Sequence, residues 1–266
     1  MPELPEVETI KRELEAMIIG KTIKKTEALL DRAFINKDGF DTNGQIEKIS
    51  RVGKYLLIDI ADKCTLVIHL RMTGKLIYET KNTTQDSKHN RVIFYFKTGD
   101  RLVFNDIRTF GLVEVLPYQT PLQSIKDIGI DALSDDFTFA LFDEICRKKA
   151  VPIKNLLLDQ KLIAGIGNIY AQEILFWAKI SPERVASKLY TKERKRIYEQ
   201  INRILLKAIK HNGTSISDYR RIDNKTGEFQ NFLQVYAKKV CPVCKNTLTK
   251  IKQGGRTTTF CSSCQK

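Results

Sequence analysis

The order of apolar and polar residues divides this chain into a first part rich in strands and a second part rich in helices. Val7, Ile10 and Leu14 recur at helical spacing, which predicts an amphipathic helix over residues 3–19. Runs of β-branched and aromatic residues, bounded by turn residues, predict strands at residues 54–60, 64–70, 91–96 and 101–104. Several short strands at this spacing are typical of a sandwich or barrel, which we place before residue 118.

Beyond residue 121 the pattern becomes helical, with predicted helices at residues 136–148, 152–158, 168–178 and 188–211. The last of these helices is strongly basic. Two polar segments predict a mobile loop at residues 81–90 and a long exposed loop at residues 213–229. Long loops in compact domains are often functional lids or disordered segments. Together these elements predict an α+β protein with more than one domain.

Four of the six cysteines form two Cys-x-x-Cys pairs near the C-terminus, which are Cys241/Cys244 and Cys261/Cys264. Sixteen residues separate the pairs, a spacing typical of a tetrahedral four-cysteine zinc site. Disulfides are the alternative, but a reducing cytosol disfavours them. Four protein ligands leave no open coordination position, so we predict one structural Zn²⁺ and no catalytic metal.

The charge of the chain indicates a polyanionic partner. Lys and Arg number 45 against 31 Asp and Glu, which gives a formal net charge of +14. Residues 236–266 contain seven Lys or Arg and no acidic residue. Within that segment Gly254 and Gly255 predict a β-hairpin that carries Arg256. Nucleic acid is the most common partner of a protein with this charge, although a merely basic protein is the alternative.

Nothing in the sequence indicates a membrane protein or a secreted one. The hydrophobic content of 42% is ordinary for a globular protein. No apolar run approaches the roughly 18 residues that a membrane span needs. The acidic, proline-bearing N-terminus does not resemble a secretory signal. We therefore expect a cytoplasmic protein with no membrane partner.

The N-terminal residues Pro2 and Glu3 are candidates for covalent catalysis. Met1 precedes a small residue, and its removal would leave proline as the N-terminus. An α-amino group has a pKa near ~7.7–8.0, so a good fraction is neutral and nucleophilic at physiological pH. An amine beside a carboxyl group suits Schiff-base chemistry on a carbonyl or masked-aldehyde carbon. The alternative is an ordinary helix start, where proline and glutamate are both favoured.

Three further segments are candidates for contact with nucleic acid. The glycines of Gly165-Ile-Gly167-Asn168 precede a predicted helix, so backbone N–H groups there suit a phosphate, unless this is an ordinary turn. Met72 and Phe110 lie in turn-like segments and would suit wedges that unstack bases. Arg108 shares a face with Phe110 and would fill the space of an extruded base. A place in the core is the more common role of a single Met or Phe.

Together these motifs resemble the bacterial formamidopyrimidine-DNA glycosylase family over nearly the whole chain, from Pro2 to Gln265. The resemblance rests on six motifs in order: Pro2-Glu-Leu-Pro-Glu-Val-Glu8, Gly53-Lys54-Tyr55, His69-Leu-x-Met-x-Gly74, Asp106-x-Arg-x-Phe-Gly111, Gly165-Ile-Gly-Asn-Ile-Tyr-Ala171 and the cysteine finger with Gly255-Arg256. It implies an N-terminal catalytic β-sandwich at residues 1–118, a helix-two-turn-helix domain at 122–232 and a zinc finger at 236–266. We expect a monomer.

The resemblance also implies a reaction. Oxidised purines, chiefly 8-oxoguanine and formamidopyrimidines, would be excised from damaged double-stranded DNA, and the abasic site would then be cleaved by β,δ-elimination. Pro2 would be the nucleophile and Glu3 the proton donor. Lys54 would lie near the reacting sugar, and Arg256 would bind phosphate with an assigned part in δ-elimination. The residues expected to contact DNA are Met72, His89, Arg108, Phe110, Lys149 and Asn168.

The sequence departs from the commoner family pattern at a few positions and leaves two other functions open. Arg71 and Ala237 stand where glycine is frequent, and Thr109 replaces a usual basic residue. One alternative is an endonuclease VIII-type enzyme for oxidised pyrimidines, against which the Leu4-Pro5 pair and the set of wedge candidates argue. The other is a non-catalytic zinc-ribbon protein that binds DNA.

Overall fold

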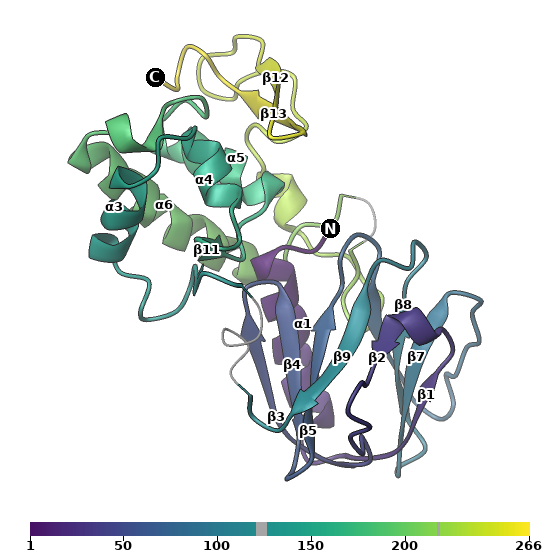
Figure 1. The fold of residues 1–266 in the computed structure, drawn as a ribbon. Helices are drawn as coiled ribbons and strands as arrows, with labels where there is room; N and C mark the ends of the chain where they lie inside the picture. The colour runs from purple at the N-terminus through teal and green to yellow at the C-terminus, as the bar shows by residue number, and fades with distance from the viewer. Residues whose placement is uncertain (121–126, 217–218) are drawn as a thin grey trace. The chain divides into compact units, whose positions relative to one another are not determined.

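The computed structural model describes residues 1–120, 127–216 and 219–266 (Figure 1). The chain folds into two compact units. The first consists of Met1–Ile125 with His211–Gln230, and the second of Lys126–Lys210 with Asn231–Lys266.

The division into three domains stays a prediction. The compact units of the structure are two, and their boundaries differ from the predicted ones. The segment His211–Gln230 groups with the N-terminal unit, although it follows the last long helix in sequence. The zinc-finger segment groups with the helices. The predicted start of the second domain, residue 122, lies outside the described residues.

The first unit is a β-sandwich with one long helix, α1 (Leu4–Ile18). Its strands are β1 (Thr22–Ala28), β2 (Phe34–Ile35), β3 (Gly44–Val52), β4 (Tyr55–Ile60), β5 (Cys64–His69), β6 (Lys75–Glu79), β7 (Asn90–Phe96), β8 (Arg101–Asn105) and β9 (Leu112–Pro117). A 3₁₀ turn, η1 (Asp31–Ala33), precedes β2. The strands follow the order β2-β9-β5-β4-β3-β1-β7-β8-β6, and only the β2–β9 pair is parallel. The predicted sandwich and its N-terminal helix are therefore present.

Strand β1 joins the two halves of the sandwich. It pairs with β3 only at Thr22 and Ile23, and along most of its length it pairs with β7. The two halves share one core, in which Leu56 of β4 and Phe94 of β7 are both buried. Such cores stabilise a fold by about 1.5–3 kcal/mol for each large aliphatic side chain that is fully buried.

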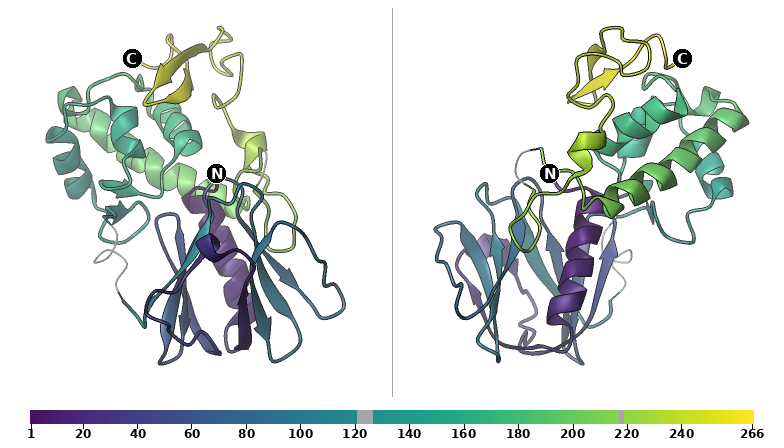
Figure 2. Two further views of the ribbon diagram at one scale, coloured as in Figure 1. Left: turned by 45° about the vertical axis from the view of Figure 1, so that its right-hand side comes forward. Right: turned by 180° about the vertical axis from the view of Figure 1, so that it is seen from behind.

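Helix α1 covers this core with the apolar face that its sequence predicts (Figure 2). Val7, Ile10 and Leu14 are at most 1% exposed. The segment that was predicted as an exposed loop, residues 213–229, contributes to the same core, since Tyr219 and Ile222 are buried in it. The prediction that this whole segment is exposed is therefore wrong. Tyr219 and Ile222 are apolar and pack into the core, although most of their neighbours in the sequence are polar.

The second unit is helical and ends in a small hairpin. Its helices are α3 (Phe139–Arg147), α4 (Ile153–Leu158), α5 (Asn168–Ala178) and α6 (Thr191–Lys210), with 3₁₀ segments η2 (Ala186–Lys188) and, at the boundary with the first unit, η3 (Phe229–Phe232). Two short parallel strands, β10 (Ile130–Asp131) and β11 (Ile163–Ala164), connect them. The predicted hairpin consists of β12 (Thr249–Gln253) and β13 (Arg256–Phe260). No helix within the described residues is long and apolar enough to span a membrane.

A charged contact connects α1 to the turn after β3. Glu8 is 8% exposed and accepts hydrogen bonds from Nε of Arg51 at 2.9 Å and Nε of Arg12 at 2.9 Å. Arg51 also donates through Nη1 to the carbonyl of Gly53 at 3.0 Å. Burial raises the pKa of Glu8, but these two arginines outweigh burial and hold the pKa below its ordinary value of 4.5. The ionised carboxylate therefore stabilises the folded state.

Replacing this carboxylate should destabilise the protein in a pH-dependent way. Glu8→Gln should lower the free energy of unfolding by about 1–3 kcal/mol at pH 7, since charge-assisted hydrogen bonds are lost. A depressed pKa gives stability that is present above the unfolded pKa and lost as pH falls through the folded one. The difference between variant and parent should therefore shrink below about pH 4.

Denaturant titrations at pH 7 and at about pH 3.5 measure this difference. Glu15→Gln is the control, because Glu15 pairs with Lys11 on the surface of the same helix at 3.3 Å. Its effect should stay within about 0.5 kcal/mol. The same loss for Glu8→Gln at both pH values would contradict the assignment.

Candidate functional site

The N-terminal candidates Pro2 and Glu3 are held at the start of α1. Pro2 is buried, and its nitrogen is joined to Met1 in this chain. Glu3 is the residue that precedes the helix; its side chain is almost fully enclosed, at 3% exposed. Its backbone N–H donates to Oε2 of Glu6 at 2.7 Å, and its carbonyl accepts from Val7 at 3.1 Å. Glu3 is therefore fixed by hydrogen bonds of the first helical turn, and Pro2 is buried directly before it.

Glu6 also binds the segment at residues 213–214. Its Oε1 accepts from the backbone N–H of Thr214 at 2.7 Å. Gly213 has φ +76°, and a Cβ there would lie 2.8 Å from Oε1 of Glu6. Only glycine fits this close approach in this conformation. One carboxylate thus connects the N-terminus to the segment that the sequence predicted as a long exposed loop.

Lys54 lies in the turn between β3 and β4, and it is 5% exposed. The turn follows Gly53 at φ +58°, and the Arg51 side chain is bonded to the carbonyl of that glycine. The charge of Lys54 acts on His69, at the end of β5. Burial, followed by the positive charges of Arg71 and Lys54, lowers the pKa of His69 to about 3. His69 is therefore neutral at physiological pH, and its Nδ1 accepts from the N–H of Arg71 at 3.0 Å.

The candidate wedge residues are carried on two turns that share one buried carboxylate. Asp106 has no exposed surface. One oxygen accepts from the hydroxyl of Thr73 and from the N–H of Arg108, and the other accepts from the N–H of Gly111 at 2.8 Å. The turn at residues 70–74 and the turn at residues 106–111 therefore hold each other in place.

Met72 and Phe110 are exposed on these turns, so the alternative of a core position does not hold for either. Met72 is 39% exposed and Phe110 is 55% exposed. The guanidinium carbon of Arg108 lies 5.0 Å from the centre of the Phe110 ring. Exposed apolar side chains on rigid turns, with a cation over one of them, have the properties that a base-separating wedge needs.

His89 lies at the end of the loop between β6 and β7. Its ring is half-buried, and its carbonyl accepts from the N–H of Asp106 at 2.9 Å. The loop with His89 is therefore bonded to the turn with Arg108 and Phe110. All the candidates from Pro2 to Phe110 belong to the first unit.

In the second unit, Asn168 lies at the start of α5 and contacts the hairpin. Its Oδ1 accepts from Nζ of Lys154 at 2.8 Å, so its amide nitrogen is left as the donor. That nitrogen donates to the carbonyl of Thr257 at 3.3 Å. Lys154 has no exposed surface and also donates to the hydroxyl of Thr258 at 2.7 Å. The buried lysine thus fixes both the orientation of the amide and the position of β13.

A pocket of about 210 Å³ opens beside these residues. Asn168, Gln172 and Tyr236 line it, together with Lys250 and Thr257 from the hairpin. A lysine, an amide donor and hydroxyl groups are suited to bind a phosphate. The pocket is consistent with the phosphate site that the glycine turn predicted.

Arg256 is exposed at the start of β13, directly before Thr257. The hairpin turn consists of Gly254 and Gly255, with φ of +56° and +72°, which only glycine adopts without strain at both positions. Lys149 lies apart in the connection between α3 and α4. Its described hydrogen bonds involve its backbone with Cys146 and Ser187, and none involves Asn168 or Arg256.

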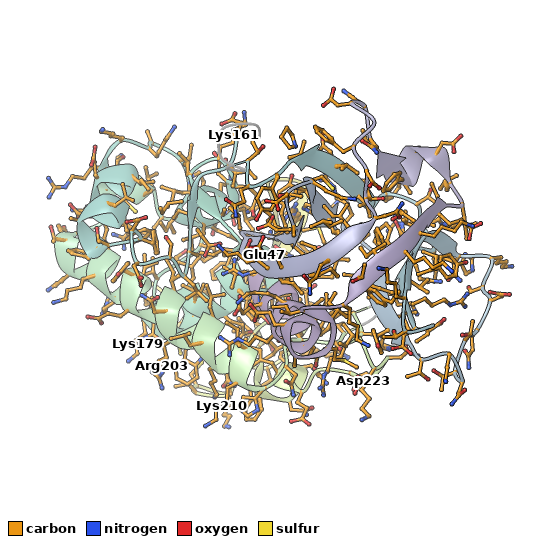
Figure 3. The ribbon with its side chains drawn as sticks, turned by 90° about the horizontal axis from the view of Figure 1, so that it is seen from below. Glu47, Lys161, Lys179, Arg203, Lys210 and Asp223 are labelled. Atoms are coloured by element: carbon orange, nitrogen blue, oxygen red, sulfur yellow. The ribbon has the colours of Figure 1, made fainter. Side chains whose placement is uncertain are left out.

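Most basic residues of α6 are exposed, but Arg194 is 5% exposed and donates through Nε to Oδ1 of Asp143 at 2.5 Å. Ile197, Ile201 and Leu205 are buried on one face. Figure 3 labels Arg203 and Lys210, which are exposed on the same helix. The helix is therefore amphipathic, and its exposed face carries most of its positive charge.

The four predicted metal ligands meet at one point. The sulfur atoms of Cys241, Cys244, Cys261 and Cys264 all lie within 4.8 Å of one another. The sulfur atoms of Cys244 and Cys261 lie 3.4 Å apart, far longer than the ~2.05 Å of a disulfide, and all four cysteines are free thiols. Tetrahedral Zn–S bonds of about 2.3 Å place sulfur atoms about 3.8 Å apart, so the cluster fits zinc. These cysteines form a structural Zn²⁺ site.

The zinc finger packs on helix α5. Cys241, Cys261 and Leu248 share a small core with Phe176 of the helix. Gln172 of the same helix accepts from the N–H of Thr259 at 2.7 Å. Metal binding therefore stabilises the hairpin, and the hairpin is in contact with the residues around Asn168.

Some residues of the site were not predicted. Asp106 lies inside one of the six motifs, but the sequence predicted a role only for its neighbours Arg108 and Phe110. Its own contacts with both turns appear only in the structure. Lys154 is a lysine within the apolar helical run at residues 152–158, which was a signal of an unusual position. Glu173 accepts three backbone hydrogen bonds, from Gln234, Val235 and Tyr236, and it fixes the chain that leads into the finger.

A β-sandwich that begins with a proline–glutamate pair, with a basic helical unit and a zinc finger, defines the helix-two-turn-helix class of DNA glycosylases. Three family models match the chain: the formamidopyrimidine-DNA glycosylase N-terminal domain at residues 1–113, its H2TH domain at residues 128–220, and the zinc finger found in FPG and IleRS at residues 238–266. The chain belongs to the formamidopyrimidine-DNA glycosylase family.

Individual relatives agree with this assignment over their full length. A formamidopyrimidine-DNA glycosylase of Carboxydothermus hydrogenoformans is 43% identical, with 100% of both chains covered. The structure of a Lactococcus lactis FPG mutant in complex with DNA containing Fapy-dG has a TM-score of 0.91 and 40% identity, again with 100% of both chains covered. A structure of MutM with DNA containing carbocyclic 8-oxo-G has a TM-score of 0.90, 40% identity and the same coverage.

Loss of one metal ligand should remove zinc and weaken DNA binding. We expect one zinc per chain in the parent protein and a large loss of zinc in Cys261→Ser. The affinity for duplex DNA should fall about tenfold or more, since the hairpin with Arg256 loses its fixed position. Cys146→Ser is the matched control, because Cys146 lies outside the cluster. Zinc content by mass spectrometry and binding titrations measure this, and full zinc retention in Cys261→Ser would contradict the ligand assignment.

Loss of the carboxylate at residue 106 should weaken binding to a duplex with a displaced or missing base more than binding to an undamaged duplex. Asp106→Asn places an amide donor against the N–H and O–H donors of the two turns, which should cost about 1–3 kcal/mol of folding stability. The affinity for a duplex with a stable abasic analogue should fall about tenfold, because the predicted wedge would act only where a base is displaced. The exposed Asp38→Asn is the control. Equal losses on damaged and undamaged duplexes would contradict the role of Asp106.

Proposed function

We propose that this protein excises oxidised purines, chiefly 8-oxoguanine and formamidopyrimidines, from double-stranded DNA and then cuts the strand at the abasic site. The observation that supports this most strongly is the fixed position of Pro2 and Glu3 at the start of α1, in a chain of the formamidopyrimidine-DNA glycosylase family. The protein would act as a monomer on DNA in the cytoplasm.

In the proposed reaction, removal of Met1 frees the secondary amine of Pro2. The amine attacks C1′ of the damaged nucleotide, so a new C–N bond forms while the glycosidic bond breaks and the base leaves. Glu3 supplies a proton to the opening sugar oxygen. The product is an iminium ion between Pro2 and the sugar. The enclosure of Glu3 supports this role, because a proton donor that is shielded from bulk water keeps a defined position.

The iminium makes the adjacent C2′–H acidic, and loss of that proton expels the 3′ phosphate. A second elimination expels the 5′ phosphate. Lys54 would stay near the reacting sugar, and Asn168 and Arg256 would bind the phosphates on either side of the lesion. Support for the Asn168 assignment comes from Lys154, which leaves the amide nitrogen of Asn168 as a donor beside the pocket.

The remaining candidates would contact the DNA around the lesion. Met72, Arg108 and Phe110 would fill the space that the extruded base leaves, which their exposure on rigid turns supports. His89 and Lys149 would contact the phosphate backbone. The two related structures contain DNA with Fapy-dG and with an 8-oxo-G analogue, and this supports oxidised purines as substrates.

Borohydride trapping on a duplex with 8-oxoguanine opposite cytosine tests the proposal. We expect a covalent complex that peptide mass spectrometry assigns to Pro2 in protein without Met1. Glu3→Gln should slow formation of the complex by about 10²–10⁴-fold, the size of a lost general-acid contribution. Pro2→Leu, which keeps Met1 in place, should form none. Glu15→Gln, which changes a partly exposed glutamate on the same helix, is the control and should react at the parent rate.

The other outcomes overturn the proposal in distinct ways. An adduct that forms only with an oxidised pyrimidine would indicate an endonuclease VIII-type enzyme. No adduct with either substrate, in protein whose mass shows that Met1 has been removed, would indicate a DNA-binding protein without the chemistry. An adduct at a lysine in place of Pro2 would keep the lyase reaction and exclude the nucleophile.

A further inference from the structure

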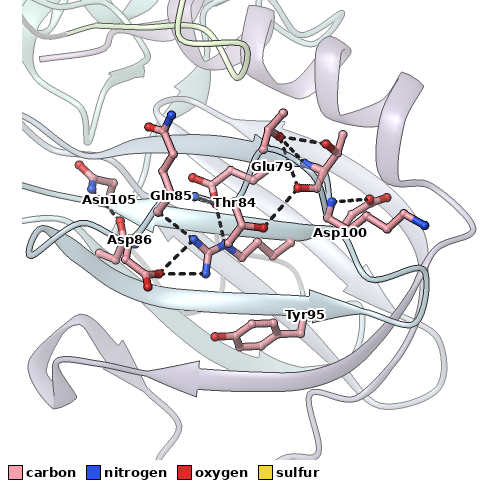
Figure 4. Close-up of polar contacts among 12 residues, drawn as sticks. Glu79, Thr84, Gln85, Asp86, Tyr95, Asp100 and Asn105 are labelled. Atoms are coloured by element: carbon pink, nitrogen blue, oxygen red, sulfur yellow. Dashed lines mark hydrogen bonds and ion pairs between the residues drawn. The ribbon is translucent and has the colours of Figure 1, made fainter.

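Polar contacts hold the loop between β6 and β7, residues 80–89, and Figure 4 labels Glu79, Gln85 and Asp86 among the residues that take part. Arg101 is the first residue of β8 and is 5% exposed. Its Nε donates to Oε2 of Glu79 at 2.5 Å, and Glu79 is its direct cross-strand neighbour on β6. Its Nη2 donates to the carbonyl of Gln85 at 2.7 Å and to Oδ1 of Asp86 at 3.3 Å. One guanidinium therefore binds the strand before the loop and the middle of the loop itself.

The two carboxylates that pair with Arg101 differ in their exposure to solvent. The side chain of Glu79 is 9% exposed, whereas that of Asp86 is 94% exposed. Burial by itself lowers the pKa of Arg101, but the hydrogen bonds and charges of Glu79 and Asp86 raise it above its ordinary value. The guanidinium thus stays ionised and keeps its donors directed at the loop.

The other end of β8 holds the other end of the loop. Asn105 donates through Nδ2 to Oδ1 of Asn90 at 2.8 Å and to the hydroxyl of Ser87 at 3.4 Å. Ser87 in turn accepts from the N–H of His89 at 3.2 Å. Arg91 donates through Nη1 to the carbonyl of Lys88 at 3.0 Å. The backbone at Lys88 and His89 is therefore fixed by the strands that flank the loop.

These polar contacts order the loop, because the loop has no apolar core of its own. Residues 81–88 are all exposed. A segment without buried apolar side chains keeps one conformation only through its hydrogen bonds to the scaffold. The loop is also bonded to the wedge turn, since the carbonyl of His89 accepts from the N–H of Asp106. Its order therefore bears on the surface that carries Arg108 and Phe110.

We propose that Arg101 is a positioning residue for DNA binding, which fixes the β6–β7 loop so that Lys88 and His89 contact phosphates of the DNA backbone. This rests on the proposed function, because it assumes that the ligand is DNA. Lys88 is exposed, so its ammonium group is accessible to a phosphate. A cation on an ordered backbone binds a phosphate without first losing the conformational freedom of a mobile loop. Arg101 itself is too enclosed to contact DNA.

The first measurement compares the affinities of the parent and Arg101→Gln for a duplex with a stable abasic analogue over a range of salt concentrations. The variant should bind about three- to tenfold more weakly at ~0.15 M salt. The slope of log affinity against log salt should become shallower by about 1–2, since each phosphate contact contributes about 0.9. Lys48→Gln removes one exposed charge elsewhere on the sandwich and controls for the change in net charge.

A double-mutant cycle then separates positioning from general destabilisation. Arg101→Gln should weaken binding in the parent but add less than about twofold in a Lys88→Ala/His89→Ala background, because the contacts that it positions are already absent. Additive losses, with an unchanged salt slope for Arg101→Gln alone, would overturn the proposal.

Asp86→Ala keeps the outcome decisive if Arg101→Gln does not fold. It removes only the exposed partner and leaves the contacts of Arg101 with Glu79 and Gln85 in place, so it should give a smaller loss and a smaller change of slope in the same direction. An unchanged slope for Asp86→Ala in a folded protein would count against the proposal. Because all readouts are binding, they are independent of borohydride trapping: failure to trap at Pro2 would overturn the chemistry and leave this test intact.

Discussion

The N-terminal site depends on the hydrogen bonds that the carboxylate of Glu6 accepts from two backbone N–H groups. A chain terminus is ordinarily the least ordered part of a fold, because few contacts hold it. Here the proposed nucleophile is the second residue, so its position has to be fixed by the first turn of α1. Glu6 binds the N–H of Glu3 with one oxygen and the N–H of Thr214 with the other. The same group therefore positions the N-terminus and the segment that packs beside it, and a change in either is felt by both.

The same arrangement recurs at other functional loops of the structure. Asp106 joins the two wedge turns, Glu173 holds the chain that enters the zinc finger, and Arg101 holds the β6–β7 loop. Each is a buried side chain that binds backbone groups of an irregular segment. A buried polar group that loses its partners is costly, so such contacts are formed fully or not at all. The scaffold thereby gives exposed loops a defined shape without burying apolar side chains in them.

Local patterns in the sequence predicted the elements and the metal site, but not these contacts. Cysteine spacing fixes the zinc ligands because each pair chelates within one turn, and periodicity identifies α1 because its apolar face repeats. The roles of Lys154 and Arg101 depend on partners that only the fold brings close: Lys154 donates to Thr258, which is 104 residues away. Met72 and Phe110 show the same limit, since sequence favoured a core position for each and only the structure shows that they are exposed.

Three departures from the family pattern have one physical feature in common. Arg71, Thr109 and Ala237 all adopt positive φ, at 53°, 59° and 58°. At two of these positions the family frequently has glycine, which adopts such angles without strain, whereas other residues do so at a cost of order 1 kcal/mol. These turns therefore adopt a backbone shape that their own residues do not favour locally. Arg71 and Thr109 lie in the two turns that Asp106 joins, and this buried carboxylate supplies the hydrogen bonds that maintain their strained conformation. The shape of the wedge turns is thus maintained by tertiary contacts, and not by local preference.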